Sequence, residues 1–460
     1  MTLLTSHSAA TFRDPAGSLR ISGERVLRTV RREFADDCLK FLRSEVARAW
    51  VEAGRLVDTR VLRDAPGEEL ELEHEPVFFP TYPWEWTPGQ WISAAELTLD
   101  FAEQQLALGR ALKDASPLNV LFRGSSPVFV DVLSTEPRDL EDPLWLAYGQ
   151  FVRTFLLPLA AYKYLGWPLA LSLMHRDGYQ PRELYPHLSA RSRFRTPIFS
   201  QVTLPYFLER RKGSRSSRKI KLRSDVALSV QTQKLRQLRQ HLRKLAPRRM
   251  ESNWSRYEQA ADHYTIEDRA HKREFVERVL ETARPRYVLD IGANTGEYSR
   301  LAAGAGAEVV SWDTDVAASE SNWRTAIANR FPILPVVADV ARPTPALGWR
   351  NSESRSLLDR ARGRFDCVLM LGVIHHLLLT DQIPMDEIAR LTAELTTRWA
   401  LVEWIPASDV RFAELCCGRG HLYGGLDEHI FLRSFSQEFV LISRRLLGNG
   451  RILFLLRRNR

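Results

Sequence analysis

The sequence predicts an α/β fold with a parallel sheet in the second half of the chain, preceded by an α+β part. Within residues 251–460, an apolar run leads into a glycine-containing turn and a helix-like segment, and six further apolar runs follow, the first four of them with helix-like segments between most of them. Strands that alternate with helices build parallel sheets. The last two apolar runs are joined by Gly448, Asn449 and Gly450, which predicts an antiparallel hairpin that closes the sheet.

Length and composition set the outer bounds. A chain of 460 residues with 44% hydrophobic residues is long enough for two or three domains that each bury a core. The four cysteines have neither a disulfide framework nor metal-ligand spacing, so no metal site is expected and a cytoplasmic location fits. No signal peptide is expected. The most apolar region, residues 155–174, is interrupted by Pro158, Lys163 and Gly166 and is expected to form buried helices rather than a transmembrane segment.

Residues 1–205 are predicted to form the α+β N-terminal domain. Their first 20 residues are polar and expected to fray, and one amphipathic helix is expected over residues 34–53. Short strand-like pieces and a second helix follow.

A group of polar residues in this domain follows the spacing of a catalytic base and two Mg²⁺ ligands. These residues are Asp114, Asn119 and Asp131. The passage resembles the catalytic loop of kinase-like phosphotransferases, but neither a glycine-rich phosphate loop nor a strand Lys–helix Glu pair precedes it. The favoured interpretation is a kinase-like scaffold without activity or a chance arrangement of loop residues, with active phosphotransfer as the alternative.

Residues 206–250 are predicted to be a basic linker that contains a helix. Arg, Lys, Gly and Ser dominate residues 209–223, and residues 231–245 carry leucines at helical spacing before Pro247. No aromatic residue interleaves the basic run, which favours a solvated connector whose leucine stripe packs on a domain. Binding of nucleic acid or of an anionic membrane is the alternative.

The most informative stretch runs from the apolar residues before Asp290 through Gly292 and Gly296. It predicts a strand, a tight turn and a helix, with glycines where a ligand approaches the backbone. The spacing Gly-x-Asn-x-Gly differs from the Gly-x-Gly-x-x-Gly of dinucleotide-binding turns. Asp290 would repel a pyrophosphate but attract a sulfonium or an amino group. Asp313 ends the next strand, about 20 residues after Gly292, where a ribose-binding carboxylate is expected.

These features resemble motifs one and two of class I S-adenosylmethionine (SAM)-dependent methyltransferases. Four segments, in both halves of the chain, also resemble a bacterial group of nodulation-protein-type methyltransferases; they are Lys113 to Val120, Pro127 to Asp131, Leu289 to Gly296 and Ile374 to Leu377. The resemblance implies a Rossmann-like seven-stranded methyltransferase sheet and SAM as the cofactor. Asp339, after the third strand, would then accept the adenine amine. The predicted cofactor-binding residues are Asp290, Gly292, Ala293, Asn294, Gly296, Asp313, Thr314, Asp339 and Val340.

His375 and His376 follow the fourth strand, where the methyl group should lie. One imidazole is expected to take the proton from a hydroxyl or amine nucleophile, and these two residues are the predicted catalytic pair. Glu403 ends the fifth strand and is either a substrate-side residue or half of a salt bridge. Tyr257 or Tyr264, ahead of the first strand, is expected to contact the cofactor or to pack in the core.

The predicted function is methyl transfer from SAM to an unidentified acceptor. A small molecule or a saccharide-like hydroxyl or amine is favoured, because no Asn-Pro-Pro-Tyr-type motif follows the fourth strand. Two alternatives stay open. One is an RNA- or DNA-modifying methyltransferase that uses the basic linker, and the other is a non-catalytic binding protein on a methyltransferase scaffold. The sequence leaves the oligomeric state open.

Overall fold

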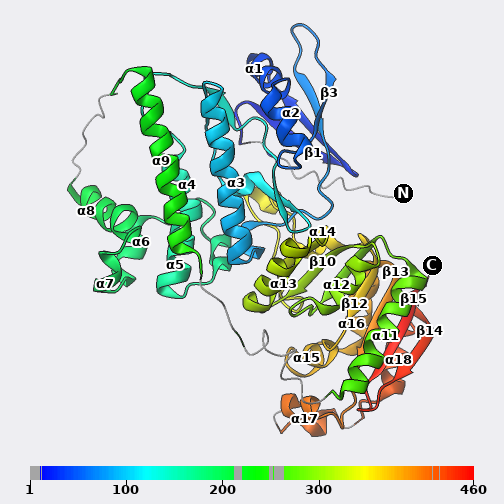
Figure 1. Cartoon of the computed structure of the whole chain (residues 1–460). Helices are drawn as coiled ribbons and strands as arrows, with labels where there is room; N and C mark the ends of the chain where they lie inside the picture. The colour runs from blue at the N-terminus through cyan, green and yellow to red at the C-terminus, as the bar shows by residue number, and fades with distance from the viewer. Residues whose placement is uncertain are drawn as a thin grey trace. The chain divides into compact units, whose positions relative to one another are not determined.

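The structure is a computed structural model that describes residue 11 and residues 13–211, 220–247, 252, 264–416, 418–423 and 425–459. The expectations for residues 212–219 of the basic run and for Tyr257 lie outside the described residues. The chain divides into two compact units, residues 1–249 and residues 250–460, and each is described by itself (Figure 1).

The N-terminal unit begins with a four-stranded antiparallel sheet in the order β1-β2-β4-β3. The strands are β1 (Gly17–Ser22), β2 (Arg25–Val30), β3 (Thr59–Arg63) and β4 (Leu70–His74). The expectation that the first 20 residues fray is wrong for β1, which pairs with β2 along its whole length. β1 is an edge strand whose residues alternate between exposed and half-buried, so it carries no apolar run that a sequence reading would detect.

Two short helices follow β2 in place of the single helix expected over residues 34–53. They are α1 (Arg32–Leu42) and α2 (Glu45–Glu52). Ser44 separates them because its hydroxyl oxygen accepts a hydrogen bond from the Ala47 backbone N–H at 3.1 Å, which makes it the N-cap of α2. The amphipathic spacing continues across this break, and it therefore hid the boundary.

The rest of the N-terminal unit is mainly helical. Helix α3 (Pro88–Ala107) begins with a capping box between Thr87 and Gln90. Two short hairpin-like pairs follow it, β5 (Arg110–Leu112) with β8 (Thr135–Pro137) and β6 (Val120–Arg123) with β7 (Ser126–Phe129). The remaining elements are η1 (Pro83–Glu85), η2 (Pro117–Asn119), α4 (Tyr148–Phe151), η3 (Val152–Leu156), α5 (Leu157–Leu165), η4 (Leu169–Leu173), α6 (Pro181–Leu184), η5 (Tyr185–His187), α7 (Ala190–Arg193), η6 (Phe199–Thr203), α8 (Leu204–Arg211) and α9 (Ser224–Leu245).

Helix α9 is part of this unit and packs against α3 and α5. The four leucines whose helical spacing predicted a packed face are buried; they are Leu235, Leu238, Leu242 and Leu245. On the α3 side, the Arg239 guanidinium donates hydrogen bonds to Asp100 Oδ1 at 2.6 Å and to Glu103 Oε2 at 2.5 Å. These contacts fix the helix along α3.

The C-terminal unit is built on a seven-stranded sheet in the order β11-β10-β9-β12-β13-β15-β14. The first five strands in chain order are parallel, and β15 is antiparallel to both β13 and β14. The predicted α/β sheet with a closing antiparallel hairpin is therefore confirmed. The strands are β9 (Tyr287–Ile291), β10 (Glu308–Asp313), β11 (Ile333–Val337), β12 (Phe365–Met370), β13 (Thr396–Trp404), β14 (Phe439–Leu446) and β15 (Ile452–Arg458).

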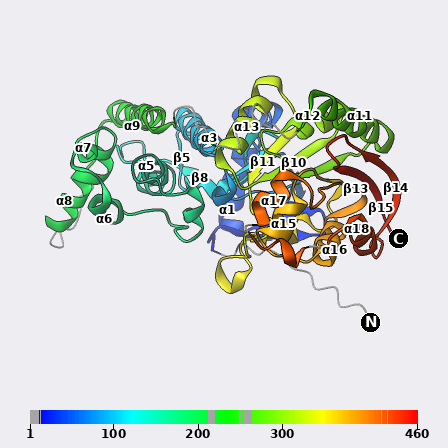
Figure 2. The ribbon, with the colours of Figure 1, turned by 90° about the horizontal axis from the view of Figure 1, so that it is seen from below.

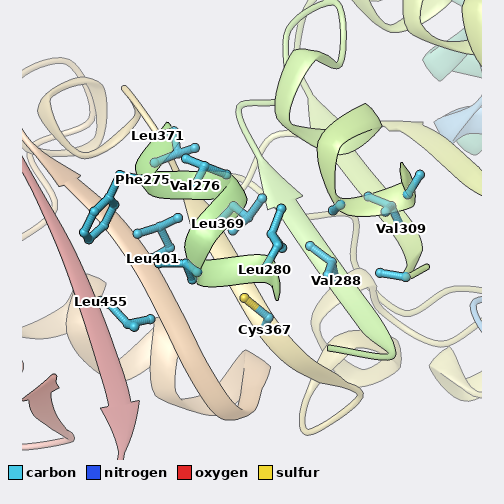
Figure 3. Packing of buried hydrophobic residues seen from close by; sticks show 14 of the residues in the cluster. Phe275, Val276, Leu280, Val288, Val309, Cys367, Leu369, Leu371, Leu401 and Leu455 are labelled. Atoms are coloured by element: carbon cyan, nitrogen blue, oxygen red, sulfur yellow. The ribbon is translucent and has the colours of Figure 1, made fainter. Parts of the chain in front are cut away.

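Helices cover both faces of this sheet, as Figures 1 and 2 show. On one face lie α11 (Ile266–Ala283), α12 (Glu297–Gly304) and α13 (Val316–Asn329); on the other lie α16 (Met385–Leu395) and α18 (Glu428–Phe435). Phe275, Val276 and Leu280 of α11 pack onto residues of β9, β12, β13 and β15 in one buried cluster (Figure 3). The other elements are η7 (Trp349–Asn351), α14 (Leu357–Ala361), α15 (Ile374–Leu379), α17 (Val410–Cys416) and η8 (Gly420–Leu422).

Candidate active site

The glycine turn lies between β9 and α12, at the carboxyl end of a central strand. Gly292, Asn294 and Gly296 have φ values of 72°, 51° and 85°, so three of five consecutive residues are in the left-handed region. The backbone N–H groups of Gly292 and Ala293 donate to the Trp312 carbonyl at 2.8 and 3.1 Å, which ties the turn to β10. The pattern of positive φ values explains the two glycines, because a residue without a Cβ atom adopts this region at little cost.

Both glycines also lie where no side chain fits. An ideal Cβ atom on Gly292 would lie 2.0 Å from Val373 Cγ2, and one on Gly296 would lie 2.1 Å from Asn322 Oδ1. The first contact joins the turn to the loop after β12, and the second joins it to α13. Gly292 and Gly296 therefore set how closely these elements approach the turn.

Asp290 lies beneath the turn rather than on its surface. Its side chain is buried, and its Oδ2 atom accepts a hydrogen bond from the Ser299 hydroxyl at 2.6 Å. Burial raises the pKa of Asp290 to about 6 because the charged form loses its hydration. The predicted attraction between this carboxylate and a cationic cofactor stays a prediction.

Asp313 holds the turn from the end of β10. Its Oδ2 atom accepts the Asn294 backbone N–H at 2.7 Å, and its Oδ1 atom accepts the Asp315 backbone N–H at 2.8 Å. Burial raises the pKa of Asp313 above its ordinary value. Thr314, next in the chain, is exposed. Asp313 thus lies beside the turn, and its contact with a ribose stays a prediction.

Asp339 follows β11 and lies nearer to solvent. Its carboxylate accepts the Ala341 backbone N–H at 2.9 Å and forms an ion pair with the Arg342 guanidinium at 3.0 Å. Arg342 also pairs with Asp381 at 2.8 Å. Val340 is half-buried.

The turn contains a hydrogen-bond acceptor and hydrogen-bond donors that a polar ligand could satisfy. Asn294 Oδ1 is buried and has no hydrogen-bond partner within the described part of the chain. The N-cap of helix α12 is Gly296, whose lack of a side chain leaves the first backbone N–H groups of the helix without a side-chain cap. Buried polar groups are costly without partners. These residues therefore fit a ligand such as the amino-acid end of SAM.

His375 and His376 begin the first turn of α15, which follows β12. Their ring centroids are 4.2 Å apart. His375 is buried and His376 half-buried, and burial lowers the pKa of His376, so its ring is neutral at pH 7. Val373, whose Cγ2 atom an ideal Cβ on Gly292 would meet, lies two residues before His375, so the histidine pair follows directly on the segment that borders the glycine turn.

A comparison with protein families identifies this unit. Residues 262–394 match the family described as "Methyltransferase domain", and this match contains the glycine turn, the acids after β10 and β11, and the histidine pair. The C-terminal unit is a class I SAM-dependent methyltransferase domain. The whole chain is also 28% identical to "Nodulation protein NoeA" of Rhizobium meliloti (strain 1021), over 98% of this chain and 96% of that protein. This similarity agrees with the resemblance that the sequence motifs predicted.

Solved structures similar to this chain include further methyltransferases. N-methyltransferase NodS from Bradyrhizobium japonicum WM9 is 12% identical with a TM-score of 0.32, covering 42% of this chain and 97% of NodS. Magnesium protoporphyrin IX methyltransferase (ChlM) from Synechocystis PCC 6803 with bound SAM is 15% identical with a TM-score of 0.30, covering 46% of this chain and 86% of ChlM. The bifunctional kinase-methyltransferase WbdD is 18% identical with a TM-score of 0.31, covering 46% of this chain and 44% of WbdD.

The methyltransferase domain also contains a buried charge network that the sequence did not predict as a unit. Lys272 Nζ lies 2.8 Å from Glu403 Oε2, and the Tyr264 hydroxyl donates to the same carboxylate. Arg451 donates to the Tyr264 hydroxyl oxygen at 2.7 Å and to Asp409 Oδ2 at 2.8 Å. Of the two roles considered for Glu403, the structure shows the salt bridge. Tyr264 belongs to the same network.

The charges of the network are balanced and stabilise one another. Burial alone would raise the pKa of Glu403, but the neighbouring Lys272 and Arg451 hold it below its usual range. Burial alone would lower the pKa of Lys272, but the Glu403 carboxylate raises it. Lys272 Nζ also lies 4.9 Å from the ring centroid of Tyr298, in the first turn of α12. An ideal Cβ atom on Gly372 would lie 3.6 Å from Glu403 Oε2. The network therefore joins the start of α12 to the end of β12.

In the N-terminal unit, the fold brings together the three residues of the kinase-like spacing. The Asn119 side-chain amide donates to the Asp114 carbonyl at 3.2 Å and to Ser134 Oγ at 3.0 Å. The Ser134 hydroxyl in turn donates to Asp131. Arg28 of β2 forms an ion pair with Asp131 at 2.9 Å. Sequence reasoning missed Arg28 because it missed β2 itself.

None of the helices in the described ranges has the length and hydropathy needed to cross a bilayer. In that same part of the chain, no group of three or more His, Cys, Asp and Glu side chains has the arrangement of a metal site.

Proposed function

We propose that the methyltransferase domain transfers the methyl group of SAM to a hydroxyl or amine of a small-molecule or saccharide-like acceptor. The observation that carries the proposal is the position of His376, half-buried in the first turn of α15 and three residues after Val373, which borders Gly292 of the glycine turn. Burial lowers the pKa of the His376 imidazole. A proton acceptor beside the cofactor turn is what a hydroxyl or amine nucleophile needs.

When bound, SAM supplies a methyl group that its sulfonium makes electrophilic. Asn294 and the first N–H groups of α12 are proposed to hold the amino-acid end. Asp313 is proposed to accept the ribose hydroxyls, because each of its carboxylate oxygens accepts one backbone N–H and keeps a second lone pair. Asp339 and Val340 are proposed to meet the adenine edge.

His376 is proposed to take the proton of the attacking O–H or N–H group. Burial lowers its pKa, so the imidazole keeps a nitrogen lone pair at neutral pH. His375, more deeply buried and 4.2 Å away between ring centroids, is proposed to orient the His376 ring. Alignment of the nucleophile with the methyl carbon is expected to supply much of the remaining rate enhancement.

Calorimetric titration of SAM and of its demethylated product tests the cofactor site. Asp313→Ala is expected to weaken binding by roughly 1–3 kcal/mol, since it removes a charged hydrogen-bond acceptor. Asp366→Ala is a matched control, because the Asp366 carboxylate also accepts two backbone N–H groups, those of Arg286 and Tyr287. Asp366 lies at the amino end of β12, whereas the glycine turn follows the carboxyl end of β9. If the wild-type protein bound neither compound, the non-catalytic scaffold would become the better interpretation.

We also propose that the N-terminal unit is a kinase-like scaffold. The hydrogen bonds that join Asp114, Asn119 and Asp131 through Ser134 support this proposal. Although burial would raise it, the Arg28 guanidinium holds the pKa of Asp131 below its ordinary value, so Asp131 is charged and already paired. Active phosphotransfer predicts Mg²⁺-dependent ATP binding that Asp131→Ala abolishes. An absence of ATP binding to the wild-type protein would leave the scaffold role.

A further inference from the structure

One end of the N-terminal unit exposes a group of large apolar side chains. They come from the residue after α7, from η6 and from α8. We call them the apolar patch, and they are Phe194, Phe199, Leu204, Phe207 and Leu208. Each is between 43% and 76% exposed. In Figures 1 and 2, α6, α7 and α8 lie together at the end of the unit that is remote from α3.

The members of the apolar patch are connected to one another. The rings of Phe194 and Phe199 stack with centroids 6.5 Å apart. Leu204, Phe207 and Leu208 have the spacing i, i+3, i+4, so they share one side of α8. A hydrogen bond from the Thr203 hydroxyl to the Arg193 carbonyl, at 2.8 Å, fastens η6 to α7. The patch is therefore one surface held by fixed backbone rather than a set of scattered side chains.

Behind the patch, a packed aromatic group supports α8. The rings of Tyr185 and Tyr206 stack with centroids 4.1 Å apart, and Phe207 meets the Tyr185 ring edge-on at 5.4 Å. The Arg193 guanidinium lies 4.3 Å from the Tyr185 ring centroid. These contacts hold α8 in place, while Leu204, Phe207 and Leu208 stay about half exposed.

The segment of the sequence that carries the apolar patch is rich in positive charge. Arg191 and Arg195 are exposed, and neither forms an ion pair within the part of the chain that the structure describes. In the sequence, residues 190–223 contain eleven Arg and Lys against one Glu, whereas the whole chain has a net charge of +9. The positive excess of the protein is therefore concentrated in the segment that carries the patch, and the rest of the chain is close to neutral.

We propose that the apolar patch, with Arg191 and Arg195 at its border, docks the protein onto a lipid surface that carries anionic headgroups. Apolar side chains beside cations fit the boundary between acyl chains and headgroups. There, burial of the apolar side chains and attraction of the cations to anionic headgroups both favour binding. A second copy of the chain is disfavoured, because two such basic segments would repel each other. Nucleic acid would use the cations and the aromatic rings but leaves Leu204 and Leu208 without a role.

Vesicle co-sedimentation with the full chain tests the proposal. Phosphatidylcholine vesicles are compared with vesicles that also contain phosphatidylglycerol, at low and high salt. The wild-type protein is expected to sediment with the anionic vesicles and to be released by salt. The triple variant Phe194→Ser, Phe207→Ser, Leu208→Ser is expected to lose about tenfold or more in partitioning. Arg191→Gln with Arg195→Gln is expected to reduce the preference for anionic vesicles while the patch is intact.

A matched control distinguishes binding through the apolar patch from nonspecific adsorption by exposed apolar side chains elsewhere. Val440→Ser with Leu446→Ser removes apolar side chains of β14 that are 47% and 59% exposed, and this variant is expected to sediment like the wild type. The arginine variant and the β14 variant should unfold at the wild-type temperature, since their substituted side chains are exposed. The triple variant is compared with the wild type below its own unfolding temperature, because Phe207 also packs against Tyr185. Labelled single-stranded RNA is titrated in the same buffers.

Five results would overturn the proposal, and the first four concern binding. They are no sedimentation with either vesicle, equal sedimentation with both, wild-type sedimentation of the triple variant, and a patch-dependent binding of RNA without binding of vesicles. A concentration-dependent dimer that the triple variant abolishes would also assign the patch to a second copy instead. None of these results depends on methyl transfer, so they leave the proposed function untouched.

Discussion

Lys272 Nζ lies 2.8 Å from Glu403 Oε2, and the side chains of both residues are buried. Lys272 comes from α11 and Glu403 from the end of β13, 131 positions apart in the chain. Because Lys272 also lies over the ring of Tyr298, and Glu403 lies next to Gly372, the pair connects the two loops that form the candidate active site.

Lys272→Met is expected to destabilise the methyltransferase domain by about 3–5 kcal/mol, because it leaves the Glu403 charge buried without its closest partner. Urea unfolding followed by fluorescence measures the change. The double variant Lys272→Met, Glu403→Leu should recover part of the loss. Arg273→Ala is the control from the same helix, since its ion pair with Glu277 at 2.9 Å is about half exposed and should contribute at most about 0.5 kcal/mol. Equal losses for Lys272→Met and Arg273→Ala would contradict this account.

Asp290→Asn is expected to stabilise the ligand-free protein at pH 8 and to leave its stability almost unchanged near pH 4. The pKa of Asp290 is raised to about 6 in the fold, above its value in the unfolded chain. The wild-type protein therefore loses stability as the pH rises from about 4 to about 6, by up to about 3 kcal/mol. Asparagine does not ionise and still accepts the Ser299 hydrogen bond. Unfolding curves at several pH values check this, and a gain that does not change with pH would count against it.

Gly296→Ala is expected to destabilise the fold more than Gly306→Ala and to abolish SAM binding. Both glycines have positive φ, 85° and 95°, so both substitutions carry the strain of that region, about 1–2 kcal/mol. Only at Gly296 does the new Cβ atom meet a neighbour, the buried Asn322 side chain, whereas nothing lies within 4 Å of the position at Gly306. Thermal unfolding and SAM titration compare the two variants. Intact SAM binding in Gly296→Ala would show that the turn can shift to make room for the new Cβ atom without loss of function.

His376→Gln is expected to lower methyl transfer at least tenfold while leaving SAM affinity unchanged. Transfer of label from methyl-labelled SAM into a bacterial small-molecule extract provides the assay. Because burial lowers the pKa of His376 below its ordinary value, wild-type activity should fall only as the pH drops below about 6.5. In the variant, this loss of activity at acidic pH should disappear. A loss of activity that begins above pH 7, or one that survives in His376→Gln, would point to another base.

Sequence patterns succeeded where structure is local. Gly292 and Gly296 reveal the strand, turn and helix because the left-handed backbone conformation is a property of each residue with its immediate neighbours. The apolar runs of β9 to β13 reveal a buried parallel sheet for the same reason. The Leu stripe of α9 likewise predicted a packed face, and the buried leucines confirm it.

Sequence patterns did not predict features that depend on distant partners or on a helix-capping hydrogen bond. β1 escaped detection because it is an edge strand whose residues are exposed or half-buried, so it carries little apolar signal. β2 lies inside the sheet, but an arginine and a threonine interrupt its apolar residues. The boundary between α1 and α2 depends on one Ser44 hydrogen bond that the amphipathic spacing does not reflect.

The sequence by itself determined the class of the C-terminal domain, its cofactor and the turn that is expected to hold that cofactor, since all three follow from short stretches of chain. Only the tertiary structure decided that Glu403 pairs with Lys272, that Arg451 joins Tyr264 to Asp409, and that Arg28 pairs with Asp131. These partners lie tens to hundreds of positions apart. They meet because burial of the apolar faces around them brings their elements together, and a charge buried in that way must find its counter-charge wherever the fold has placed it.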